Sequence, residues 1–175
     1  NQVWAMNPDG TGRTQLSKSK DDIEGFVFSP DGNSIILIKE IPFHESIKEN
    51  PSDLSKASGR VVTDLMYRHW DEYVESIPHP FLAKVSGNSI NDGVDILKGE
   101  PFECPMKPFG GIEQLAWSPD SKSIAYTCRK KTGRDYAIST DADIYLYNTT
   151  TGTTKNLCKP IGYVEPEIDA CHSMK

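Results

Sequence analysis

The stretch that decides the fold is IEGFVFSPDGNSIILI, Ile23–Ile38. Its two apolar runs flank a Ser-Pro-Asp-Gly turn, which is the layout of a β-hairpin. The proline presets φ at the first corner, the aspartate can accept hydrogen bonds from the amides that follow, and the glycine tolerates the positive φ of the exit. Because an isolated hairpin is marginal in water, this one must pack against further strands.

The same pattern recurs 89 residues later as IEQLAWSPDSKSIAYT, Ile112–Thr127, with no gap and seven of sixteen positions identical. A second element also repeats, because Val3–Leu16 and Ile144–Leu157 each consist of a strand, a polar Gly-containing turn and a strand. Phe81–Leu97 is a third copy of this element, with its turn at Ser86–Asn88. Four short antiparallel strands per repeat are typical of propeller blades.

We therefore predict an all-β fold, a partial β-propeller of four-stranded antiparallel blades with a short helical insertion. Residues 1–158 form the propeller part, in which 1–20 is the outer hairpin of one blade, 21–100 is a blade with an insertion over 39–80, and 108–158 is a further blade. Residues 159–175 form an irregular tail or the start of a broken blade. The alternative, a β-sandwich of unrelated hairpins, is disfavoured by the internal identity.

The chain is expected to be a piece of a longer protein, because it opens inside a strand and holds about two and a half blades, whereas propellers usually close with 4 to 8. Self-association is another way in which its open edges could be covered.

Composition and charge exclude several classes of protein. With 175 residues, 37% of them hydrophobic, the chain is long enough for one globular domain. A net charge of −6 and no Lys/Arg run longer than Arg129–Lys131 give no footprint for nucleic acid. No stretch approaches the roughly 18 to 20 apolar residues of a membrane helix, so no membrane span is predicted.

No metal and no cofactor are predicted, because the cysteines form no Cys-x-x-Cys pair. One disulfide that joins Cys128 to Cys104 or Cys158 and a set of free buried thiols are equally compatible with the spacing; the fourth cysteine is Cys171.

The insertion contains TDLMYRHWDEYVE, residues 63–75, whose apolar spacing predicts a short helix or turn. In one interpretation Met66, Trp70 and Tyr73 anchor the insertion to its blade while the charged side chains face water. In the other, these aromatic and acidic residues line a pocket whose carboxylates hold a cationic amine. The residues of that second interpretation are Trp70, Asp71, Glu72 and Tyr73.

No catalytic residue is predicted in this chain. The nucleophile-elbow pattern Gly-x-Ser-x-Gly does not occur in the sequence. A serine triad could be composed on paper with any histidine, but none has the elbow or oxyanion-hole context that makes a serine nucleophilic. The histidines are His44, His69, His79 and His172.

The two Ser-Pro-Asp hairpins resemble the TolB-type propeller repeat. The segment GRVVTDLMYRHWDEY, Gly59–Tyr73, resembles part of the amino-terminal propeller of prolyl oligopeptidase-family serine peptidases, nearest the dipeptidyl peptidase 5 branch. This resemblance covers the chain up to Leu157. Proteins of this family carry their Ser-Asp-His triad in a carboxy-terminal α/β-hydrolase domain, and the propeller restricts access to it.

The resemblance implies the non-catalytic propeller portion of a secreted or periplasmic dipeptidyl or aminoacyl peptidase, which gates access and helps to bind the amino termini of peptide substrates. In this role Asp71 and Glu72 would be the amine-binding carboxylates, with Trp70 and Tyr73 as walls. The alternative is a stand-alone TolB-like propeller that binds a protein or peptide partner and has no enzymatic role. The Arg68–Asp71 segment favours the peptidase, because a generic binding propeller has no reason to carry it.

Overall fold

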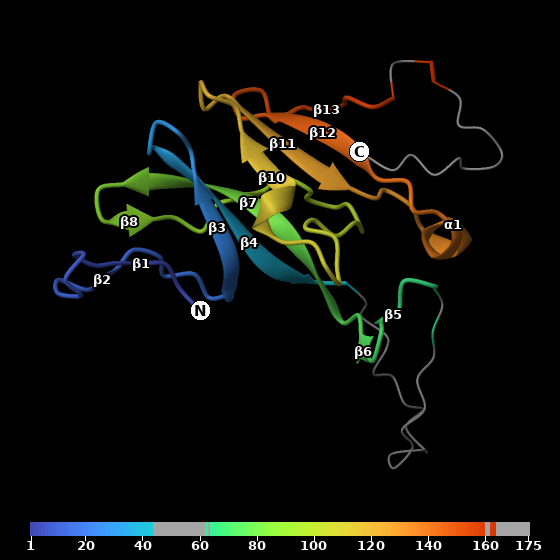
Figure 1. Ribbon diagram of the computed structural model, residues 1–175, viewed down its shortest axis with the longest axis horizontal. Helices are drawn as coiled ribbons and strands as arrows, with labels where there is room; N and C mark the ends of the chain where they lie inside the picture. Colours follow the sequence, from blue (N-terminus) through green and yellow to red (C-terminus); the bar gives the residue numbers. More distant parts are fainter. Residues whose placement is uncertain (44–61, 63, 160–161, 164–175) are drawn as a thin grey trace, which may run out of the picture.

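The computed structural model describes residues 1–43, 62, 64–159 and 162–163, which form a set of antiparallel sheets (Figure 1). The first large sheet has the order β3–β4–β7, and its outermost position is divided between β8 and β9, both of which pair with β7. Its strands are β3 (Ile23–Phe28), β4 (Ser34–Pro42), β7 (Ser76–Ser86), β8 (Ser89–Ile90) and β9 (Val94–Asp95).

The second large sheet follows the chain order β10–β11–β12–β13, with every neighbouring pair antiparallel. A short 3₁₀ turn, η1 (Ile112–Gln114), leads into it. The predicted all-β fold with four-stranded antiparallel blades is therefore confirmed. The strands are β10 (Leu115–Trp117), β11 (Ser123–Cys128), β12 (Asp143–Asn148) and β13 (Thr154–Asn156), and a separate hairpin at the amino terminus joins β1 (Trp4–Ala5) to β2 (Thr14–Gln15).

The Ser-Pro-Asp turn has the same hydrogen bonds in both copies. In the first, the Ser29 hydroxyl donates to Asp31 Oδ1 at 2.6 Å and accepts from the Ser34 amide at 2.9 Å. The second copy repeats both distances with Ser118 and Asp120. At the exit, φ is +71° for Gly32 and +61° for the serine that replaces it in the second copy, so the positive φ is kept without glycine.

Strand β4 is buried on both faces, which explains its uninterrupted apolar run. Ile36 and Ile38 face the second large sheet and pack in a core with its inward side chains. Ile35 and Leu37 face the opposite way and pack with residues that include Val3, which precedes β1. Figure 1 shows the second sheet and the β1–β2 hairpin on opposite sides of the first sheet.

The predicted short helix or turn over residues 63–75 is a turn and not a helix in its described residues, 64–75. The described residues form a hairpin of two short strands, β5 (Arg68–His69) and β6 (Glu72–Tyr73), joined by a two-residue turn. The apolar spacing misled because Met66 and Val74 are buried on the flanks of a hairpin rather than on one helical face. A short helix does occur, but it is α1 (Gly133–Ile138), in the connection between β11 and β12.

The boundaries of the insertion also move inward. Pairing between β4 and β7 continues to Pro42↔Ser76, so residues 39–42 and 76–80 belong to the sheet rather than to the insertion. The polar part of the predicted insertion, 52–59, lies outside the described residues, as does nearly all of the predicted tail. No described helix is long and apolar enough to cross a membrane.

Three cysteines are described, and all three are free thiols. Cys104 and Cys128 lie in the core between the two large sheets, where burial raises the pKa of Cys104 well above its ordinary value and that of Cys128 to about 12. Since the thiolate is the reactive form, both groups behave as small apolar side chains.

Because β4 is buried on both faces, alanine substitutions at adjacent positions should destabilise the chain to a similar extent. Ile36→Ala and Leu37→Ala should each lower the free energy of unfolding in urea by about 2–5 kcal/mol, because each leaves a cavity in a different core. Phe28→Ala, at a side chain 41% exposed, is the control and should cost clearly less. Tolerance of either β4 substitution would mean that one face of the strand is not packed.

The turn hydrogen bonds predict a pH dependence. Hydrogen bonds from Ser29 and Asn33 lower the pKa of Asp31 from 3.8 to about 2, so the carboxylate contributes stability that is present above pH 3.8 and lost as the pH falls towards 2. Asp31→Ala should therefore lower the thermal midpoint at pH 7, and the difference from wild type should shrink between pH 4 and pH 2. A difference independent of pH would contradict this origin.

Candidate functional site

A cavity of about 780 Å³ opens where the β5–β6 hairpin meets the end of β4 and the start of β7. The segment that follows Cys104 closes its other side through Lys107 and Pro108. Its size is in the range of small-molecule and peptide sites. The lining residues are Glu24, Glu40, His69, Trp70, Asp71, Glu72, Tyr73, Val74, Glu75, Ser76, Lys107 and Pro108.

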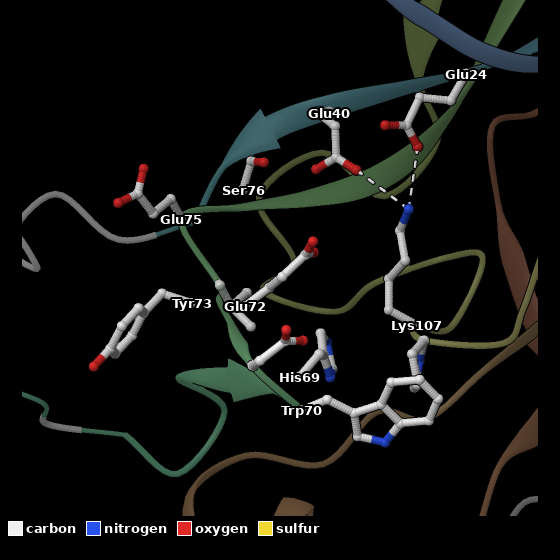
Figure 2. A pocket seen from close by; sticks show the side chains of 12 residues that line it. Glu24, Glu40, His69, Trp70, Glu72, Tyr73, Glu75, Ser76 and Lys107 are labelled. Atoms are coloured by element: carbon white, nitrogen blue, oxygen red, sulfur yellow. Dashed lines mark hydrogen bonds and ion pairs between the residues drawn. The ribbon is translucent and has the colours of Figure 1, made fainter.

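The cavity is strongly acidic. Among the described residues that line it, five are Asp or Glu and one, Lys107, is a lysine. The Lys107 ammonium lies 3.3 Å from Glu24 Oε2 and 3.9 Å from Glu40 Oε1, and Figure 2 shows its side chain reaching up between these two carboxylates. The negative potential of such a lining attracts a cation rather than an anion.

A β-bulge directs Glu24 into this site. Ile23 pairs with Lys39 and Gly25 with Ile38, so Glu24 is an extra residue in β3. A bulge bends its strand and re-aims a side chain, and bulges are over-represented next to active sites. Here the bulge brings the Glu24 carboxylate to the same ammonium as the Glu40 carboxylate at the end of β4.

The Glu40 carboxyl is held in an environment that disfavours its charge. Burial raises its pKa above the ordinary 4.5, and the negative charge of Glu24 adds to the shift. A hydrogen bond from Ser76 and the positive charge of Lys107 oppose the shift without cancelling it. A second cation near Glu40 would therefore stabilise the ionised form.

All four residues predicted to form a substrate pocket, Trp70, Asp71, Glu72 and Tyr73, line the cavity. Their arrangement contradicts the interpretation in which the two aromatic residues anchor the insertion, since Trp70 is 72% exposed and Tyr73 is also exposed. Figure 2 shows the Tyr73 ring pointing away from Lys107, whereas the Trp70 ring lies below Lys107 in this view. Of the predicted anchors, Met66 alone is buried.

Glu24, Glu40 and Lys107 were not predicted as site residues. Glu24 occupies the same position in its repeat as Glu113 does in the second copy. Because Glu113 is not among the lining residues, this repetition does not identify Glu24 as a site residue. No local pattern links Lys107 to a carboxylate 83 residues earlier.

Within the described residues, no group of three or more His, Cys, Asp or Glu side chains is arranged to hold a metal ion.

Trp70 occupies a strained backbone conformation at the turn of the β5–β6 hairpin. Its φ is +51°, a left-handed value that bulky residues rarely adopt and that costs of order 1–3 kcal/mol. Its ring packs edge-to-face on Phe109, with centroids 5.1 Å apart. Both rings are largely exposed, so this contact covers little apolar surface, and a tryptophan placed here is explained better by a ligand than by stability.

Replacing Trp70 tests whether its side chain contributes to stability. Trp70→Asn should leave the thermal midpoint unchanged or raise it slightly, because asparagine tolerates the left-handed region and the lost ring is mostly in solvent. A matched change at an exposed residue with ordinary backbone, Phe109→Asn, removes the partner ring without relieving strain and should not be stabilising. Strong destabilisation by Trp70→Asn alone would assign the ring a structural role.

Comparisons with known proteins agree with the peptidase resemblance. No protein-family model matches the chain. It is 54% identical over 135 residues to dipeptidyl-peptidase 5 of Porphyromonas gingivalis, an alignment that covers 77% of this chain and 20% of that protein. It is 47% identical over 156 residues to dipeptidyl-peptidase 5 of Porphyromonas endodontalis, covering 89% of this chain and 23% of that protein.

The solved structure of TolB from Acinetobacter baumannii aligns with this chain at a TM-score of 0.42 and 15% sequence identity. The alignment covers 89% of this chain and 26% of the TolB chain. The sequence identities to the two Porphyromonas proteins confirm the resemblance to the dipeptidyl peptidase 5 branch. The chain spans about a fifth of the length of these relatives, and it is homologous to that part of dipeptidyl-peptidase 5.

Proposed function

We propose that this chain is the non-catalytic propeller portion of a dipeptidyl or aminoacyl peptidase, and that its acidic cavity binds the amino terminus of a peptide substrate. The observation that carries the proposal is the meeting of Glu24 and Glu40 at one ammonium group, that of Lys107. A lysine ammonium and the ammonium of a peptide amino terminus have the same charge and donor chemistry. Carboxylates bind both through charge-assisted hydrogen bonds.

The rim of the cavity suits the same ligand. Asp71 and Glu72 add two more carboxylates from the hairpin turn, and the exposed Trp70 ring offers a face on which a cation gains about 0.5–2 kcal/mol. In this proposal the propeller gates access and orients the peptide, while the peptide bond is cleaved by groups outside this chain. A secreted or periplasmic location belongs to the same proposal and rests on the family resemblance.

The competing hypothesis is a stand-alone propeller that binds a protein or peptide partner. One observation supports it: the outward face of the second sheet carries Ala125, Ile144 and Leu146 only half-buried, opposite the face that packs in the core. Such a face suits a further sheet or another copy of the chain. It does not account for the acidic cavity, whose ligand preference distinguishes the two hypotheses.

Titration calorimetry with Ala-Ala-amide and its N-acetylated form tests the proposal. The free amine should bind, and acetylation should weaken binding at least ten-fold because it removes the charge. Glu24→Gln and Glu40→Gln should each weaken binding about ten- to a hundred-fold, the range for a hydrogen bond to a charged group. Glu113→Gln, at the position equivalent to Glu24 in the other repeat, is the matched control and should bind like wild type.

The Glu40→Gln variant also controls for unfolding. Because the pKa of Glu40 is raised in the folded chain, its ionisation costs stability as the pH rises through that pKa, and the amide should be at least as stable as wild type at pH 7. This advantage should vanish well below pH 4.5. Equal affinity for the free and acetylated peptides would reject the amine-binding site and favour the partner-binding propeller.

A further inference from the structure

A buried carboxylate, Glu103, connects the β5–β6 hairpin to the second large sheet. It lies in the segment between β9 and η1 and is 3% exposed. Its Oε2 is 2.9 Å from Nε2 of His69 on β5, and its Oε1 accepts a hydrogen bond of 3.2 Å from the Tyr136 hydroxyl on α1. A partly buried histidine and a buried tyrosine, from separate elements, therefore converge on one carboxylate.

The environment of Glu103 compensates for burying its charge. A buried carboxylate is tolerated only where hydrogen bonds or opposite charges replace water. The Arg129 guanidinium lies 4.0 Å from the centre of the Tyr136 ring, which brings a positive charge close to the hydrogen bond between Tyr136 and Glu103. The backbone of Glu103 is held as well, because its carbonyl accepts from the Cys128 thiol at 3.5 Å.

The hairpin itself has little intrinsic stability. It contains two residue pairs, Arg68↔Tyr73 and His69↔Glu72, far fewer than an independently stable sheet needs. Besides Glu103, an apolar cluster of Met66, Val74, Ile77 and Tyr136 attaches it, as does the contact between the exposed rings of Trp70 and Phe109. The segment before it adds one polar contact, from the Gly133 amide to Asp64 Oδ2 at 3.3 Å.

The hairpin carries both these anchors and one wall of the cavity, and two of the anchors, His69 and Val74, also line the cavity. His69 reaches inward to Glu103, while the turn that follows it carries Asp71 and the exposed Trp70 along the cavity rim. Figure 2 shows the His69 and Trp70 side chains leaving adjacent positions of the hairpin. The orientation of the rim thus depends on where the His69 ring is held.

We infer that Glu103 is a positioning residue for the acidic cavity: it holds the β5–β6 hairpin against α1 and so sets the place of Asp71 and Glu72. Glu103 is not among the residues that line the cavity, and it acts through His69, which is. Its effect on peptide binding rests on the proposed function. Its effect on the hairpin does not.

Hydrogen exchange followed by mass spectrometry on the 175-residue chain tests the inference. In Glu103→Ala, amides of residues 67–74 should exchange about ten- to a hundred-fold faster, because the hairpin opens locally once its buried acceptor is gone. Exchange in β4 and β11 should stay as in wild type. Glu103→Gln keeps an acceptor oxygen of nearly the same shape and should restore much of the protection.

Two further variants separate positioning from general damage. Glu100→Gln changes a carboxylate three residues away that is ion-paired with Lys130, and it should leave the hairpin protected. Tyr136→Phe removes the hydroxyl that donates to Glu103 but keeps the contact with His69, so it should give a smaller increase in exchange than Glu103→Ala. Unchanged exchange over 67–74 in Glu103→Ala, or faster exchange throughout the chain, would overturn the inference.

The binding assay is read separately. If the wild-type chain binds Ala-Ala-amide, Glu103→Ala should weaken that binding about ten-fold while Glu103→Gln binds more tightly than Glu103→Ala, and normal affinity in Glu103→Ala would overturn the positioning role. If the wild-type chain does not bind the peptide at all, the proposed function fails. Faster exchange confined to 67–74 would still support the anchor.

Discussion

The structure depends on the burial of β4 from both sides. A strand with two apolar faces has no stable position at the edge of the molecule, so the β1–β2 hairpin and the second large sheet must both pack against the first. The polar residues of β4 lie towards its ends: Ser34 and Lys39 are buried and hydrogen-bonded, and Glu40, which follows Lys39, lines the cavity.

The candidate site is assembled at this exit from segments that are distant in sequence. β3 contributes a bulged glutamate, β4 a partly buried one, the hairpin an acidic turn, and the segment after Cys104 a lysine. The first three of these are locally unfavourable, through an unpaired strand residue, a desolvated charge and a left-handed tryptophan respectively. Local conflicts of this kind concentrate at functional sites, because a sequence selected for stability alone would have removed them.

The features that were predictable from sequence are those determined within a few residues. The Ser29–Ser34 turn is an example, since its side-chain hydrogen bonds span at most five positions and recur in the second repeat. The burial of β4 on both faces is likewise predicted by its unbroken apolar run. The hairpin at 68–73 was missed because its apolar residues fit a helix equally well and because Trp70 adopts a φ that its residue type disfavours. The Glu24–Lys107 contact depends on a bulge and on sheet packing, which have no local signature here.

Lys107 changes the thermodynamics of the cavity it occupies. An amine that reaches Glu24 and Glu40 meets a cation already there, so association is an exchange of one ammonium for another rather than the neutralisation of a bare charge. The loss of the resident contact offsets part of the Coulombic gain of the newcomer. The other carboxylates of the lining, Asp71, Glu72 and Glu75, still favour a charged amine over its acetylated form, and the shape of the cavity adds to this selectivity. The lysine side chain also regains rotamer freedom when displaced, so part of the driving force is entropic.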